Sequence, residues 1–127
     1  MSRNGFLAVS GVLGALAVGL GAFGAHGLKD RLSTEMLAVW HTAVQYHFYH
    51  AIAMLAVAAG VAGLWKQPLT GWACWAWTLG IVVFSGSLYA LALTGIKILG
   101  AITPFGGVAF IAGWVLIAIA GWKASLE

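Results

Sequence analysis

The sequence predicts an all-α integral membrane protein, folded as a single-domain four-helix up-down-up-down bundle. Of its 127 residues, 62% are hydrophobic and only 7% are charged, whereas a soluble domain has about 25% charged residues. The mean hydropathy is +0.99, and charged residues separate four apolar stretches, each near the ~20 residues that a membrane-spanning helix needs. This composition excludes a soluble globular domain and a disordered tail. With 6 scattered Lys and Arg residues, it also excludes a nucleic-acid-binding protein.

The first two apolar stretches cover residues 5–25 and 34–63. The first contains no charged residue, and it is longer than the roughly 7–15 apolar residues of a secretion signal, so we expect a retained helix. Gly27 stands where a C-terminal glycine would end this helix. The second stretch begins at a capping hydroxyl, Ser33 or Thr34.

The last two stretches cover residues 71–93 and 104–122. Residues 65–68 break the chain before the third stretch, and the fourth begins with a capping hydroxyl, Thr103, followed by Pro104 at the first helical position. Long apolar runs without alternation of apolar and polar residues are helices in a membrane, where the backbone must satisfy its own hydrogen bonds. The connections are short, so neighbouring helices are expected to be antiparallel.

Tryptophan and lysine positions test this topology. Four spans place both chain ends and the second connection on one side of the membrane, where these side chains anchor at the headgroups. Five of the seven tryptophans fall near that side: Trp65, Trp72, Trp75, Trp77 and Trp122. Basic residues are equally frequent on the two sides, and the terminal amine favours both termini being cytoplasmic.

Small residues recur along the predicted helices. In the first helix, Ser10, Gly14, Ala17, Gly21 and Gly24 draw one continuous seam at spacings of four and three. Such seams allow close contact between helices in lipid. We expect ordinary packing within the bundle, and self-association as a homo-oligomer where a seam faces a second copy.

Polar residues gather in the second helix. His41, Gln45 and Tyr49 share one side at 100° per residue, and His47 and His50 lie on another. Three interpretations stay open. The first is interhelical hydrogen bonding, the second is a metal or haem site built on His-x-x-His, and the third is a polar cavity for a small ligand, a lipid headgroup or a proton.

The sequence offers little chemistry beyond these side chains. No nucleophile elbow, zinc-protease motif or phosphate loop is present, so we expect no enzyme, no catalytic residue, no cofactor and no metal. Lys97 lies in an apolar connection, where we interpret it as an interfacial cation whose ammonium reaches the headgroups. The expected partners are membrane lipids, a second copy of the chain and an unidentified small ligand, with no nucleic acid.

Three motifs together carry a family resemblance. Residues 21–28 read GAFGAHGL, residues 84–89 read FSGSLY and residues 99–107 read LGAITPFGG. With these motifs the chain resembles the small bacterial inner-membrane proteins of domain-of-unknown-function family 423, the YwdK/YgdD-like group, which has relatives among small animal transmembrane proteins. The resemblance implies a multi-pass protein of the bacterial cytoplasmic membrane and supplies no activity.

The resemblance also focuses the candidate polar site. Tyr46 and His50 match the Tyr-x-x-x-His usual in that family, whereas His41 and His47 are outside its pattern. We expect His26 to meet Tyr89 near one membrane face, and His50 to meet Ser85, Ser87 or Tyr46 at greater depth. The full candidate set is His26, His41, Gln45, Tyr46, His50, Ser85, Ser87 and Tyr89. A structural or interaction protein that self-associates is the favoured function, with translocation or binding of a small solute, lipid or proton as the alternative.

Overall fold

The protein is entirely helical. The computed structural model describes residues 1–127 and contains no strand, so the all-α prediction is confirmed. In chain order the elements are α1 (Arg3–His26), α2 (Thr34–Ala58), the 3-10 helix η1 (Val61–Lys66), α3 (Pro68–Gly80), the π-helical segment η2 (Ile81–Ser85), α4 (Gly86–Thr94) and α5 (Leu99–Ser125).

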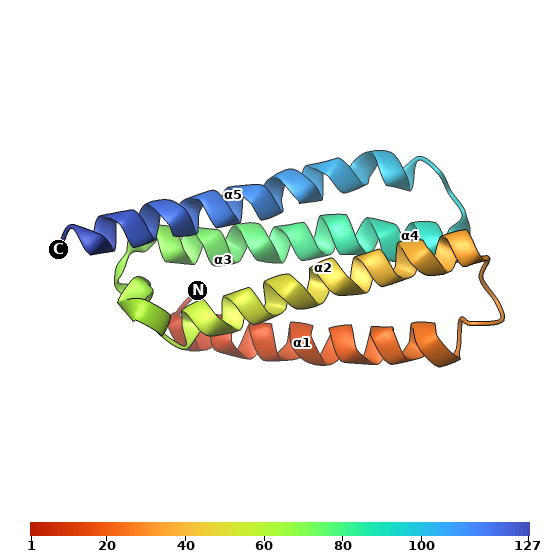
Figure 1. Cartoon of the computed structure of the whole chain (residues 1–127), viewed down its shortest axis with the longest axis horizontal. Coiled ribbons are helices and arrows are strands. Elements are labelled where there is room, and N and C mark those ends of the chain that lie inside the picture. Colours follow the sequence, from red (N-terminus) through yellow and green to blue (C-terminus); the bar gives the residue numbers. More distant parts are fainter.

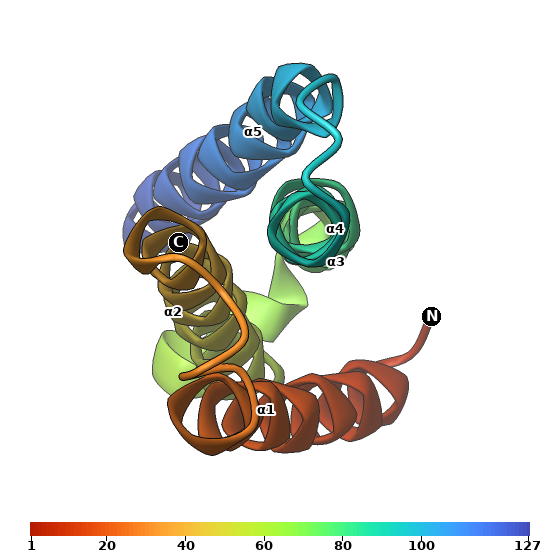
Figure 2. The same cartoon turned by 90° about the vertical axis from the view of Figure 1, so that its right-hand side faces the viewer.

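Helices α3, η2 and α4 form one continuous rod, Pro68–Thr94, which we call the α3–α4 rod. The closest-packed pairs of helices are α1 with α2 and α3 with α5, and α2 packs against α4 between the two pairs. Figure 1 shows the rods lying side by side with both termini at one end, and the end-on view of Figure 2 shows α1 beside α2 and α5 beside the α3–α4 rod.

The second predicted stretch ends earlier than its apolar composition suggests. Helix α2 begins as predicted with Ser33 as its cap, whose hydroxyl accepts a hydrogen bond from the Met36 N–H at 3.1 Å. It ends at Ala58 rather than at residue 63, because Gly60 takes a left-handed φ of +93°. The Arg3 guanidinium then caps the freed carbonyls of α2. Its Nε and Nη2 donate to the carbonyl oxygens of residues 58 and 59 at 2.6 and 2.7 Å.

The two prolines occupy different helical positions. Pro68 is the first residue of α3, where its missing N–H costs nothing. Pro104 was predicted to begin the last helix, but α5 begins five residues earlier, at Leu99, and contains this proline. A short turn starts α5 ahead of the proline, with Leu99 N–H donating to the Ile96 carbonyl at 3.1 Å. Pro104 therefore only removes one hydrogen bond near the start of a formed helix.

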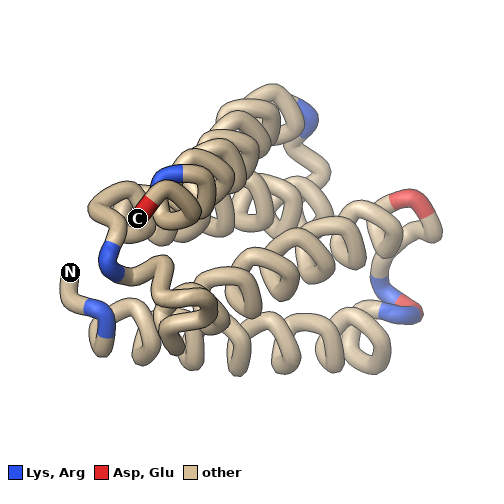
Figure 3. Tube along the Cα trace, turned by 60° about the vertical axis from the view of Figure 1, so that its left-hand side comes forward, with Lys and Arg blue, Asp and Glu red and all other residues tan.

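Three segments are long and apolar enough to cross a membrane: α1, the α3–α4 rod and α5. The sequence predicts four spans, and α2 is the one that does not reach this level, because three histidines and Gln45 lower its hydropathy. Figure 3 shows that the Lys, Arg, Asp and Glu residues gather at the two ends of the rods, so the lengths between them carry no charge.

Two clusters of large side chains form the core. The larger surrounds Trp77 and includes Phe6, Met54 and Phe110, and the smaller surrounds Trp40. Glycines admit the rings at both places. A Cβ atom at Gly24 would lie 2.5 Å from the indole of Trp40, and Cβ atoms at Gly80 and Gly113 would clash with the rings of Phe110 and Trp77. A Cβ atom at Gly106 would clash with the Phe84 backbone.

Candidate functional site

The polar side chains of α2 divide between an inner and an outer face. His47 and His50 are buried, at 3% and 4% exposure. His41, Gln45 and Tyr49, which we call the outer stripe, are exposed on the outside of the molecule. The sequence predicts His41 and Gln45 in a polar interior, but both side chains lie on the outer surface. The inner face of α2 is formed instead by a buried stripe that includes Trp40, Ala43, His47 and Met54.

His50 is held by two hydrogen bonds and a stacked ring. Its Nδ1–H donates to the Tyr46 carbonyl at 2.6 Å, and its Nε2 accepts from the Trp114 indole N–H at 3.1 Å. The imidazole stacks on Phe110 with a centroid distance of 3.6 Å and an interplanar angle of 9°. Only the neutral ring with its proton on Nδ1 fits both bonds, because an imidazolium would direct an N–H at the indole N–H.

The two serines predicted to meet His50 have other partners. The Ser85 hydroxyl is fully buried and donates to the Ala43 carbonyl of α2 at 2.8 Å. The Ser87 hydroxyl lies 2.6 Å from the Thr103 hydroxyl of α5. Each serine therefore joins the α3–α4 rod to a different neighbouring helix, and neither contacts the imidazole.

Tyr89 pairs with a histidine that the sequence analysis left out of the site. The Tyr89 hydroxyl lies 2.9 Å from Nδ1 of His47, whereas His26, its expected partner, is exposed at the end of α1 and makes no side-chain hydrogen bond. The His47 Nε2 atom is buried and has no hydrogen-bond partner. His47 could have been found from its spacing, since it follows Trp40 by seven residues and Ala43 by four and so continues the buried stripe.

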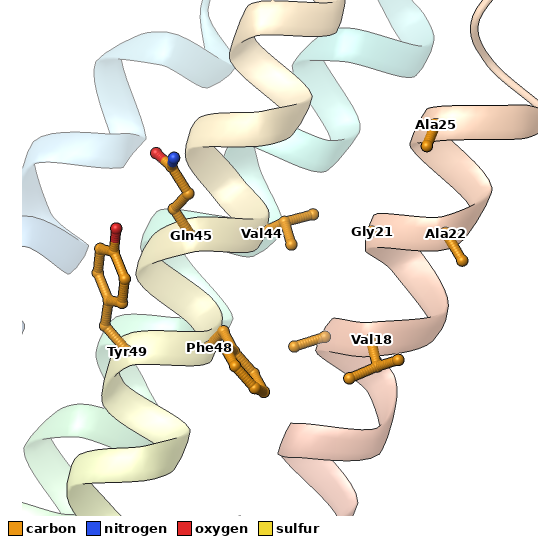
Figure 4. Close-up of a pocket in the computed structure, with 9 residues that line it drawn as sticks. Val18, Gly21, Ala22, Ala25, Val44, Gln45, Phe48 and Tyr49 are labelled. Carbon is orange, nitrogen blue, oxygen red and sulfur yellow. The ribbon is translucent and has the colours of Figure 1, made fainter.

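A shallow groove runs between α1 and α2 and occupies about 500 Å³. We call it the small-residue groove, because its α1 side consists mainly of glycine and alanine. Figure 4 shows Val18, Gly21, Ala22 and Ala25 on one wall and the α2 side chains on the other. Its lining residues are Ala17, Val18, Gly21, Ala22, Ala25, Val44, Gln45, Phe48 and Tyr49.

A second groove lies between α2 and α5 and occupies about 600 Å³. We call it the aromatic groove, because five rings line it together with His50. Its lining residues are Tyr46, Tyr49, His50, Phe84, Gly107, Phe110, Ile111 and Trp114. The groove reaches the outer stripe at Tyr49, and two residues of the candidate polar site, Tyr46 and His50, line it.

The histidines do not converge on one point. His47 and His50 have different partners in different neighbouring helices, and no three His, Cys, Asp or Glu side chains lie close enough together to hold a metal ion. Lys97 is exposed in the connection between α4 and α5. The α1–α2 connection, which contains Lys29 and Arg31, lies at the same end of the rods (Figure 1). Figure 3 shows charged residues at this end.

Comparisons with known proteins support the family assignment. Residues 20–107 match the family described as "Protein of unknown function (DUF423)". UPF0382 membrane protein YwdK of Bacillus subtilis (strain 168) is 50% identical over 121 residues, which cover 93% of this chain and 96% of the relative. UPF0382 membrane protein SH2409 of Staphylococcus haemolyticus (strain JCSC1435) is 50% identical over 116 residues, covering 88% of this chain and 93% of the relative.

No solved structure matches the chain. The family match spans more than half of the residues, and the relatives align over nearly their whole length. The resemblance drawn from the three sequence motifs is thereby confirmed, and the chain belongs to the DUF423 family of membrane proteins of unknown function.

Proposed function

We propose that the protein crosses the bacterial inner membrane with all four rods, as an up-down-up-down bundle, and acts as an interaction protein with no chemistry of its own that binds a second copy. The outer stripe of α2, next to the small-residue groove, carries this proposal. The family assignment and the three apolar segments support residence in a membrane.

The fourth span is supported by the surroundings of α2. Helix α2 has 25 residues and is close in length to α1, which has 24. It packs between α1 and α4. The charged residues of the chain lie at the ends of the rods (Figure 3). Each of the two buried histidines of α2 has one hydrogen-bond partner in another helix, which lowers the cost of placing it at membrane depth. Both termini lie at one end of the rods, which we assign to the cytoplasm (Figure 1).

Accessibility to a membrane-impermeant thiol reagent in intact cells tests the spans and the orientation. We expect Lys97→Cys to react, Lys123→Cys to react only after the cells are opened, and the parent chain to stay unlabelled, because Cys74 is buried. Labelling of both variants in intact cells would contradict the four-span arrangement.

The exposed side chain of Gln45 is the first feature that favours a second copy. This side chain is exposed near the middle of α2, where the proposed span meets hydrocarbon, and it makes no hydrogen bond within the chain. An amide carries both donors and an acceptor, so two Gln45 side chains meeting at a two-fold axis can form reciprocal hydrogen bonds. Polar side chains at this depth normally face a protein partner or a water-filled cavity.

The small-residue groove gives the second copy a surface to approach. Gly21, Ala22 and Ala25 leave the α1 wall low beside the outer stripe (Figure 4). Low walls of this kind let helices pack closely in lipid, where van der Waals contact and interhelical hydrogen bonds drive association. We therefore place the two-fold axis along α2, with part of each copy in the small-residue groove of the other.

Cross-linking and a blocking variant test the association. Gln45→Cys should form a disulfide-linked dimer in native membranes, whereas Val82→Cys, an exposed position on the α3–α4 rod, should not. Ala22→Leu should fill the groove and shift the purified protein toward the monomer. Gly19→Leu is the matched control, since a side chain at this α1 position meets open space outside the groove. A monomeric parent protein in membranes would overturn the proposal.

The structure gives no specific support for translocation through a polar interior. The four hollows are grooves between helices that open to the outside. His41 and Gln45, which were expected to line a path, lie on the outer surface.

A further inference from the structure

We propose that the aromatic groove between α2 and α5 binds the ring of a lipid-soluble quinone that enters from the bilayer. The inference rests on α2 and α5 both crossing the membrane, and it shares only Tyr49 with the surface proposed for self-association. No part of it requires a reaction, since the groove is proposed only to bind and orient a neutral planar ring.

The shape of the groove favours a flat ligand. Tyr46 lies against Phe84 with a centroid distance of 4.8 Å and faces Phe110 at 6.2 Å with an interplanar angle of 25°. His50 is stacked on Phe110 at 3.6 Å. Phe110 and His50 are themselves buried, so the exposed rings of Tyr46 and Trp114 are the ones that offer faces and edges to a further ring. The volume of about 600 Å³ suits a ring with the first part of its tail and is typical of small-molecule sites.

The polar groups of the groove favour a neutral ligand that accepts hydrogen bonds. The hydroxyls of Tyr46 and Tyr49 line it or its edge and have no hydrogen-bond partner in the chain, whereas His50 and Trp114 already satisfy each other. A phenol hydroxyl surrounded by hydrocarbon needs an acceptor. No charged residue lines the groove, so it offers nothing to an ionised lipid headgroup. Quinone carbonyls supply neutral acceptors on a planar ring.

A glycine keeps the groove open. Gly107 lies in the lining of α5, and a Cβ atom there would meet only the Phe84 ring, at an ordinary contact distance of 3.8 Å. The neighbouring Gly106 is different, because a Cβ atom at that position would clash with the Phe84 backbone. A larger side chain at residue 107 can therefore fill the groove without disturbing how α5 packs against the π-helical segment η2.

Binding of decyl-ubiquinone to the purified full-length protein in a neutral detergent tests the proposal by isothermal titration calorimetry. We expect saturable binding by the parent protein and loss of binding in Gly107→Leu. Gly121→Leu is the matched control. It places the same side chain on the same helix, where nothing lies within 4 Å and no groove is present, and it should bind like the parent.

Two further measurements test the chemistry of recognition. Tyr46→Phe keeps the ring and removes one hydroxyl, so it should weaken binding by roughly five- to ten-fold, the effect of one hydrogen bond. Decylbenzene, which has a comparable tail and no carbonyl, should bind far more weakly than the quinone.

Absence of binding by the parent protein, or equal binding by Gly107→Leu, would overturn the quinone site, and equal binding of decylbenzene would overturn the role of the carbonyl acceptors. The oligomeric state of the same samples separates this result from the proposed function. If the parent protein does not bind the quinone but its Gln45→Cys variant still cross-links, only the groove proposal is wrong. A chain that fails the thiol-labelling test of four spans removes both.

Discussion

Replacement of Gly24 by alanine should test the closest approach between α1 and α2. A Cβ atom at residue 24 would lie 2.5 Å from both Cδ1 and Nε1 of Trp40. This indole is 1% exposed, and its N–H donates to the Leu20 carbonyl at 2.9 Å. It also packs against Tyr89, with a centroid distance of 4.7 Å. The indole cannot withdraw from the new methyl group without losing that hydrogen bond or displacing the tyrosine.

The expected cost is the sum of three effects. Overpacking a filled core costs about 1–3 kcal/mol, and loss of the Trp40 hydrogen bond adds about 0.6 kcal/mol on the scale measured for interhelical bonds in membranes. Alanine returns about 1 kcal/mol through its higher helix propensity. The net loss of unfolding free energy should be roughly 0.5–2.5 kcal/mol. Gly19→Ala meets open space and should gain up to about 1 kcal/mol.

Equilibrium unfolding in mixed micelles with increasing dodecyl sulfate, followed by circular dichroism, measures this difference. A double-mutant cycle with Trp40→Ala isolates the contact, because Gly24→Ala should become harmless once the indole is gone. The reasoning would be refuted if Gly24→Ala were as stable as Gly19→Ala, or if its effect were the same with and without the indole.

Three further substitutions probe single contacts. His50→Ala should lower the unfolding free energy by about 2–4 kcal/mol, since it removes two hydrogen bonds and the ring stacked on Phe110. His50→Gln should recover part of this loss. Equal stability of both variants and the parent would contradict a structural role of His50. Arg3→Met should cost about 1–2 kcal/mol by uncapping α2, visible as faster amide exchange at its last turn, and Arg3→Lys should restore some protection. Ser85→Ala should cost only about 0.6 kcal/mol; a loss above about 2 kcal/mol would mean that the Ala43 carbonyl depends on this hydroxyl.

The helices themselves were predictable, because uninterrupted apolar runs leave the backbone no alternative in a membrane. Caps were predictable where a side chain provides them, as Ser33 does for α2. The last residue of α2 and the first residue of α5 were not predictable. The second apolar run continues past Ala58, and only the left-handed conformation of Gly60 and the distant Arg3 guanidinium fix where the helix stops. Pro104 signals a start, but a turn formed upstream of it decides where α5 begins.

The inward face of α2 was harder to predict than its existence. Lipid and protein core are equally apolar, so hydropathy does not distinguish the two faces of a membrane helix. Both faces of α2 also carry polar residues, and the assumption that polar groups turn inward could not choose between Gln45 and His47. The choice depends on partners far along the chain, Tyr89 and Trp114 among them.

The contacts of Arg3 with the end of α2 bear on the order in which the protein is made. The ribosome has synthesised all of α1 and α2 once it has added residue 60. The residues that form the Arg3 cap and the contact between Trp40 and Gly24 are then all present. None of these contacts needs a residue beyond residue 60, so the first hairpin can close before α3 is synthesised. At that stage His47 and His50 lack their hydrogen-bond partners Tyr89 and Trp114, which are synthesised later. Two ring nitrogens of the first hairpin, His47 Nδ1 and His50 Nε2, therefore gain their hydrogen bonds only when the later helices pack against it.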